Sequence, residues 1–179
     1  MKHGLVLLLI GTVVLMIEGA IARVVPVRFV PDLGLLLVVA FALSVRNPGT
    51  GVLLSAYLGF VTDVFSGALL GQHVLLYIVM FGVSRFSGSR LNLRGPLPQS
   101  LFVAVLAVFQ SGALWALTAF FVVSSGVGLV HPTDVLPYAL ITGLVAPFVS
   151  EGVVRLMARM DDDEGSKPLM DLTPPQFLA

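Results

Sequence analysis

The chain has 179 residues, of which 57% are hydrophobic and 11% charged, and its mean hydropathy is +1.01. Roughly a quarter of the residues are charged in an ordinary soluble domain, so this composition excludes a water-soluble fold. The formal net charge is zero, and the sequence has no continuous basic face that would bind nucleic acid. Cysteine is absent, which excludes disulfide bonds, thiolate metal sites and a cysteine nucleophile.

Six long apolar stretches separated by short polar turns predict a membrane protein. Lipid offers no hydrogen bonds to the backbone, so spanning segments are either helices of about 17 to 25 residues or closed barrels. The sequence lacks the strict alternation of a barrel. The predicted fold class is therefore all-α and polytopic, with six transmembrane helices in residues 1–159. Residues 160–179, which are acidic and contain Pro174-Pro175, are expected to form a disordered cytoplasmic tail.

The first stretch, residues 4–22, follows Lys2 and is expected to be an uncleaved signal-anchor helix. Its end, Ala20-Ile21-Ala22, has the small-x-small form of a signal-peptidase site, so a cleaved leader is the alternative. Two features favour the anchor: Glu18 interrupts the region before that site, and the apolar run is longer than that of a usual leader.

The second stretch, about residues 28–45, is the shortest, because Arg28 and Pro31 leave an apolar core of only 33–45. At about 1.5 Å per residue this core covers roughly 20 Å of a ~30 Å hydrocarbon layer, so a full span and a half-inserted helix both stay open. Asp32 directly follows Pro31 and is expected to cap the helix. Its carboxylate would accept the first backbone N–H groups, where the helix dipole also favours negative charge.

The remaining stretches are predicted at residues 49–65, about 69–86, 97–123 and 135–157, with breaker-rich turns between them. Counted over alternate loops, eight Lys and Arg side chains fall on one side and two, Arg23 and Arg28, on the other. The eight are Lys2, Arg46, Arg85, Arg90, Arg94, Arg155, Arg159 and Lys167. The positive-inside rule then places both termini in the cytoplasm.

Small residues recur every four positions along the third stretch, at Gly51, Ser55 and Gly59, and Asp63 continues the series. Small side chains on one helix face let another helix approach closely, so Asp63 is expected to point into the protein. A capping or interhelical hydrogen-bond acceptor is preferred for Asp63 over a site for a transported ion or proton. His73 follows ten residues later, across a tight turn, where it can pair with Asp63.

Two further acids lie within or at the end of apolar stretches. Glu18 shares a small-residue stripe with Gly4 and Gly11 and is expected to face a helix or a partner. Glu151 precedes Arg155 by four residues, the favourable order for an ion pair at a helix end. No nucleophile elbow, phosphate-binding loop or two-His metal helix is present, so no catalytic, cofactor or metal site is predicted. An unrecognised intramembrane enzyme stays as an alternative.

The segment 58–73, LGFVTDVFSGALLGQH, resembles the signature hairpin of the MreD family of bacterial rod-shape-determining membrane proteins. It contains Asp63, Gly67, Gly71 and His73. Pro31-Asp32-Leu33, leading into the second stretch, also resembles that family, as do the six-span length and the short start. The resemblance extends to about Arg159, and the acidic tail has no counterpart in it.

The resemblance implies a noncatalytic inner-membrane scaffold subunit of the peptidoglycan elongation machinery. Such a subunit would associate with MreC and, through it, with RodA, a class B penicillin-binding protein and the cytoskeletal MreB. The family fold is similar to the substrate-binding subunit of energy-coupling-factor vitamin transporters, which supplies an alternative function. A transporter subunit would carry an Ala-x-x-x-Ala docking face and several polar groups in a pocket of its outer half. The first stretch has only Ala20 and Ala22, which are not four apart, and the chain offers few such polar groups. The expected structural or partner-binding residues are Glu18, Pro31, Asp32, Gly51, Ser55, Gly59, Asp63, Gly67, Gly71 and His73.

Overall fold

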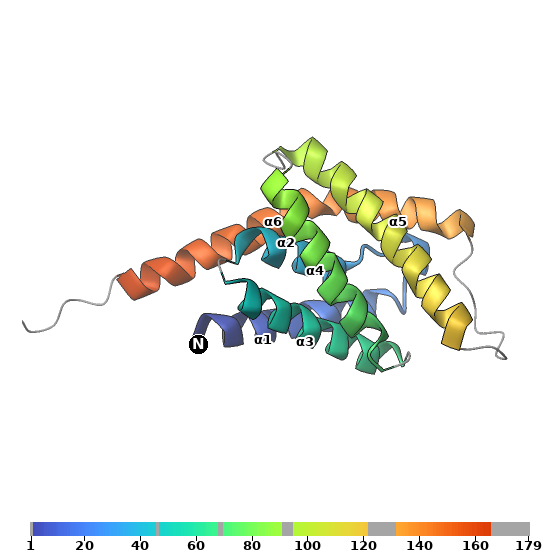
Figure 1. Ribbon diagram of the computed structural model, residues 1–179, viewed down its shortest axis with the longest axis horizontal. Coiled ribbons are helices and arrows are strands. Elements are labelled where there is room, and N and C mark those ends of the chain that lie inside the picture. The colour runs from blue at the N-terminus through green and yellow to red at the C-terminus, as the bar shows by residue number, and fades with distance from the viewer. Residues whose placement is uncertain (1, 46, 68–69, 91–94, 122–131, 166–179) are drawn as a thin grey trace, which may run out of the picture.

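The computed structural model describes residues 2–45, 47–67, 70–90, 95–121 and 132–165, and in these residues all regular structure is helical. A 3-10 turn, η1 (Val27–Phe29), leads into the second helix (Figure 1). The helices are α1 (Lys2–Ile21), α2 (Leu33–Ser44), α3 (Pro48–Ser66), α4 (Gln72–Arg90), α5 (Pro96–Phe121) and α6 (Pro132–Gly165). They correspond in order to the six apolar stretches of the sequence.

Four of the described helices, α1, α3, α5 and α6, are long and apolar enough to cross a membrane. Helix α2 is apolar but has only 12 residues, and α4 has 19 residues that include Arg85 and Arg90. The structure therefore supports a multi-pass helical membrane protein. A count of six spans stays a prediction for α2 and α4.

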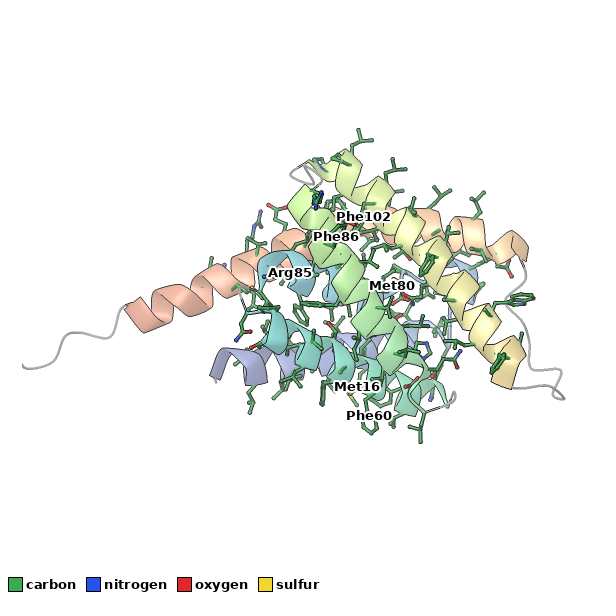
Figure 2. The ribbon with its side chains drawn as sticks, in the orientation of Figure 1. Met16, Phe60, Met80, Arg85, Phe86 and Phe102 are labelled. Atoms are coloured by element: carbon green, nitrogen blue, oxygen red, sulfur yellow. The ribbon has the colours of Figure 1, made fainter. Side chains whose placement is uncertain are left out.

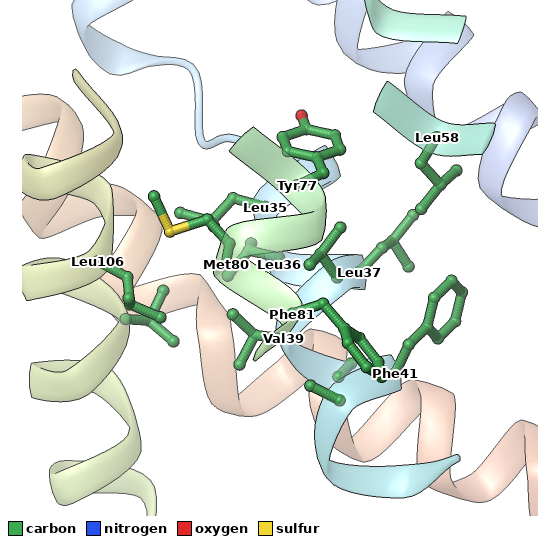
Figure 3. Close-up of a cluster of buried hydrophobic side chains, with 14 of the residues drawn as sticks. Leu35, Leu36, Leu37, Val39, Phe41, Leu58, Tyr77, Met80, Phe81 and Leu106 are labelled. Atoms are coloured by element: carbon green, nitrogen blue, oxygen red, sulfur yellow. The ribbon is translucent and has the colours of Figure 1, made fainter. Parts of the chain in front are cut away.

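Helix α2 lies at the centre of the bundle and contacts each of the other five helices. All nine residues from Gly34 to Ala42 are buried. Figure 3 shows Leu35, Leu37 and Phe41 of this helix among side chains of the neighbouring helices. A helix that is apolar on every side is typical of a position surrounded by other helices. Other helices rather than lipid surround α2. Its short length therefore does not leave backbone polar groups exposed to the hydrocarbon layer.

Side chains of the protein form hydrogen bonds with free backbone groups at both ends of α2. At its start Asp32 Oδ1 accepts a hydrogen bond from the Leu35 N–H at 2.7 Å, as the sequence predicted. At its end the Arg85 guanidinium donates to the carbonyl oxygens of Ala42, at 3.1 Å, and of Val45. An anion at the first turn and a cation at the last turn both interact favourably with the helix dipole.

The outer surface of the bundle is apolar, as expected for helices that face lipid. Met16 on α1 and Phe60 on α3 are 57% and 52% exposed, whereas Met80 of α4 is fully buried (Figure 2). Because lipid tails are as apolar as these side chains, burial from water does not drive the helices together. Close packing and interhelical hydrogen bonds do so instead.

Helix α6 is the longest helix and projects beyond the others at its C-terminal end (Figure 1). The expected ion pair is present there, with Arg155 Nη2 donating to Glu151 Oε1 at 2.5 Å between two exposed side chains. The helix continues past Arg159 to Gly165, so the first six residues assigned from sequence to the tail are helical. The rest of the predicted tail, 166–179, lies outside the described residues.

Candidate functional site

The small-residue stripe of α3 packs against α4. A Cβ atom built on Gly59 would lie 2.6 Å from the Val74 Cα and 2.7 Å from the His73 carbonyl oxygen, so two backbones meet at this point. A Cβ on Gly51 would lie 2.3 Å from the Phe81 ring, and Ser55 between them is fully buried, with its hydroxyl bonded to the Gly51 carbonyl. The stripe therefore places one helix directly on the next, as expected for small residues at this spacing.

Asp63, the last residue of the stripe, is 1% exposed and caps the first turn of α4. Its Oδ2 accepts a hydrogen bond from the Gly71 N–H at 2.8 Å, and its Oδ1 accepts one from the His73 N–H at 3.0 Å. The first N–H groups of a helix have no partner within the helix. A carboxylate from α3 supplies that partner for α4, which fixes the angle and register of the hairpin.

The His73 ring completes this arrangement. Its Nδ1 lies 2.7 Å from Asp63 Oδ1, so the pair that the sequence spacing allowed is present. The ring also meets the Tyr77 ring edge-to-face, with 6.0 Å between the ring centres. The hairpin is thereby joined to a residue one turn further along α4.

The hairpin turn has a glycine with a positive φ angle at each end. Gly67 ends α3 with φ of +64°, and Gly71 precedes α4 with φ of +98°. L-residues with a side chain rarely adopt these angles. Gln72, the first residue of α4, ties the hairpin to α5 by donating to the Leu114 carbonyl at 3.3 Å and to the Thr118 hydroxyl at 3.2 Å.

A second group of buried polar side chains surrounds Asp32, which follows the half-buried Pro31. Asp32 Oδ2 accepts hydrogen bonds from Gln110 Nε2 at 2.6 Å and from the Tyr138 hydroxyl at 2.7 Å. The Tyr77 hydroxyl donates to Oδ1 at 3.4 Å, and the Asp32 N–H donates to Thr142 Oγ1 at 3.2 Å. We call these residues, Asp32, Tyr77, Gln110, Tyr138 and Thr142, the Asp32 centre. It joins the start of α2 to α4, α5 and α6.

The Asp32 carboxylate accepts four hydrogen bonds, including the cap to Leu35. Hydrogen bonds to a charged group are about twice as strong as neutral ones. All four donors are neutral groups of the protein. The centre therefore fixes the Asp32 carboxylate in place between four helices.

Gly34 and Glu18 lie at the edge of the Asp32 centre. A Cβ on Gly34 would lie 2.1 Å from the Tyr77 hydroxyl, so only glycine lets that hydroxyl reach the start of α2. Glu18 of α1 is half-buried and lies against the backbone N–H groups of Leu33 and Gly34, close to Asp32. Of the two positions that the sequence left open for Glu18, facing a helix or facing a partner, the structure shows Glu18 against the start of α2.

The sequence reasoning identified Asp32 as a helix cap and missed the other members of the centre. Tyr77, Gln110, Tyr138 and Thr142 are 45 or more positions away, so spacing along the chain did not connect them with Asp32. A usable signal was present in Gln110, an amide in the middle of an otherwise apolar stretch, because buried polar groups usually have partners. Among the described residues, no group of three or more His, Cys, Asp or Glu side chains could hold a metal ion.

Comparisons with known proteins agree with the resemblance in the hairpin. Searches of curated proteins and of solved structures give no match. The family model for the rod shape-determining protein MreD matches residues 2–150, which include the Asp32 centre and the whole α3–α4 hairpin. This match covers well over half of the 179 residues. The chain therefore belongs to the MreD family of rod shape-determining membrane proteins.

Proposed function

We propose that this chain is a noncatalytic scaffold subunit of the peptidoglycan elongation complex in the bacterial cytoplasmic membrane, and that it maintains rod shape through association with MreC. The α3–α4 hairpin is the observation that carries this proposal. Asp63 and His73 side chains are 0% and 14% exposed and bind groups of the chain itself. A hairpin locked in this way presents a rigid surface to a partner and holds no reacting group toward a substrate.

The chain would then be linked to RodA, to a class B penicillin-binding protein and to MreB, either indirectly through MreC or by direct contact. Membership of a family of shape-determining proteins supports this assignment. The ion pair Glu151–Arg155 and the projecting end of α6 lie on the proposed cytoplasmic side, where MreB is located.

The experiment is purification of the tagged full-length chain from its own cells in a mild detergent. MreC should co-isolate with it, and a tagged multi-pass membrane protein of unrelated function should not retain MreC. Recovery of a folded chain without MreC would contradict the proposal.

The same experiment tests the alternative, a substrate-binding subunit of a vitamin-type transporter. Such a subunit would co-isolate with an ATPase-linked coupling protein. The buried polar groups around Asp32 are one observation in its favour. Their hydrogen bonds are directed at Asp32 itself, however, which favours a structural role over ligand binding.

A further inference from the structure

Positive charge without nearby acids marks the part of the chain that forms α4 and α5. Between Asp63 and Asp134 the sequence has no Asp or Glu, but it contains Arg85, Arg90 and Arg94. The Arg85 guanidinium donates to carbonyl oxygens at the end of α2, and Arg94 lies outside the described residues. Arg90, the last residue of α4, carries a charge that no acid on α4 or α5 neutralises.

The structure holds Arg90 at the protein surface without a carboxylate partner. Arg155 is paired with Glu151, but Arg90 takes part in no ion pair among the residues that the structure describes. Its guanidinium lies over the Phe86 ring, 5.2 Å from the ring centre, and Phe86 is 65% exposed. An aromatic ring attracts the cation through its face and does not replace a charged hydrogen-bond acceptor. The N–H groups of Arg90 therefore suit an anion from outside the chain.

The length of α4 matches the distance between the two membrane surfaces. The helix begins after the hairpin turn at Gln72 and has 19 residues. At about 1.5 Å per residue it extends about 28 Å, close to the ~30 Å thickness of the hydrocarbon layer. A helix of this length that begins at one membrane surface ends at the other, so Arg90 would lie at the depth of the lipid headgroups.

An exposed apolar stripe leads from Arg90 along α4 toward the middle of the membrane. Its residues are three or four positions apart, so they lie on one face of the helix. Their side chains are 40% to 65% exposed, and they are Phe86, Val83, Val79 and Leu75. A lipid acyl chain can lie along this stripe while its headgroup lies beside Arg90.

We propose that Arg90 binds the phosphate of an anionic phospholipid of the phosphatidylglycerol type, with an acyl chain along the exposed stripe of α4. The planar guanidinium offers paired N–H donors that match phosphate oxygens. The ammonium group of a zwitterionic lipid compensates its own phosphate, whereas an anionic lipid brings the charge that Arg90 lacks. Basic side chains at a membrane surface attract anionic lipids for this reason. A lipid preference of this kind goes beyond the scaffold role.

The test is native mass spectrometry of the purified full-length chain, titrated with dioleoylphosphatidylglycerol or dioleoylphosphatidylcholine, which have the same acyl chains. We expect the anionic lipid to bind about fivefold more tightly, which corresponds to the ~1 kcal/mol of one arginine at an anionic surface. Arg90→Gln should lower this ratio to below about twofold. Arg155→Gln is the matched control and should keep the ratio, because it removes the same charge from an exposed arginine that already has a carboxylate partner.

Equal binding of the two lipids by the wild-type chain would overturn the proposal, and so would an Arg90→Gln chain that keeps the preference. Glycerol 3-phosphate distinguishes a lipid from a free phosphate, because it has the phosphate and no acyl chain. It should not displace the anionic lipid at equal concentration, and displacement would overturn the lipid assignment.

Phe86→Leu provides a second test in case Arg90→Gln does not fold. It keeps an apolar side chain on the stripe and removes the ring that holds the guanidinium. The preference for the anionic lipid should fall in this variant, and an unchanged ratio would refute the site at Arg90.

Discussion

The Asp63 carboxylate holds both the backbone N–H and the ring of His73, at 3.0 Å and 2.7 Å. A single side chain of α3 thereby caps α4 and pairs with its second residue. Asp63 and His73 are ten positions apart in the sequence and lie on different helices. This carboxylate holds the hairpin together with the close packing at Gly59, because its hydrogen bonds have no equivalent in lipid.

Asp63→Leu should therefore damage the protein more than Asp63→Asn. Leucine leaves the Gly71 and His73 N–H groups unpaired, at a cost of about 1–3 kcal/mol for each buried donor. Asparagine keeps one acceptor oxygen, so it can accept from one of these two N–H groups and loses the bond to the other. Rod shape and MreC co-purification should be measured in cells that carry each variant as the only copy. Loss of rod shape in Asp63→Asn with normal protein level and normal MreC binding would show that the charge itself acts in the function.

Gly59→Ala should destabilise the chain, because the added methyl group meets the backbone of α4 at 2.6 Å. Overpacking of this kind costs about 1–3 kcal/mol. Gly82→Ala is the matched control, since Gly82 is also in a helix and its Cβ would meet nothing within 4 Å. Thermal unfolding in detergent should show a lower midpoint for Gly59→Ala and no loss for Gly82→Ala. Equal midpoints would remove the argument for a tight α3–α4 contact.

Tyr138→Phe should lower stability by about 1.5–3 kcal/mol, the usual contribution of a hydrogen bond to a charged group. It removes one donor from Asp32 and keeps the ring. Tyr57→Phe is the comparison, because the Tyr57 hydroxyl bonds Thr12 at an exposed position and should contribute much less. Chemical or thermal unfolding of both variants checks the difference. A Tyr138→Phe chain as stable as Tyr57→Phe would mean that the Asp32 centre adds little to the fold.

Both termini should lie in the cytoplasm, because Lys and Arg concentrate on one set of loops. Reporter fusions at Ala179 and near Gly126 should read inside and outside respectively. A periplasmic C-terminus would contradict the six-span topology. Mass spectrometry of the intact N-terminus decides the leader question, since a chain that starts at Arg23 would show cleavage after Ala22.

The sequence by itself determined where the helices lie along the chain, although α6 extends beyond its predicted end. Apolar run length, Pro and Gly at the turns, and Asp32 ahead of α2 act over a few residues, so they are readable without a fold. The pairing of Asp63 with His73 was also accessible, because a tight hairpin brings close positions together.

Only the tertiary structure decided the surroundings of α2. The sequence left open whether this short stretch spans the membrane alone, and the fold places it inside five other helices. Gln110 and Tyr138 reach Asp32 from 78 and 106 positions away. In a membrane the apolar pattern does not indicate which face of a helix points into the protein. Apolar side chains are equally stable against lipid and against other helices. Partner choice for the buried polar groups therefore depends on how all six helices pack together.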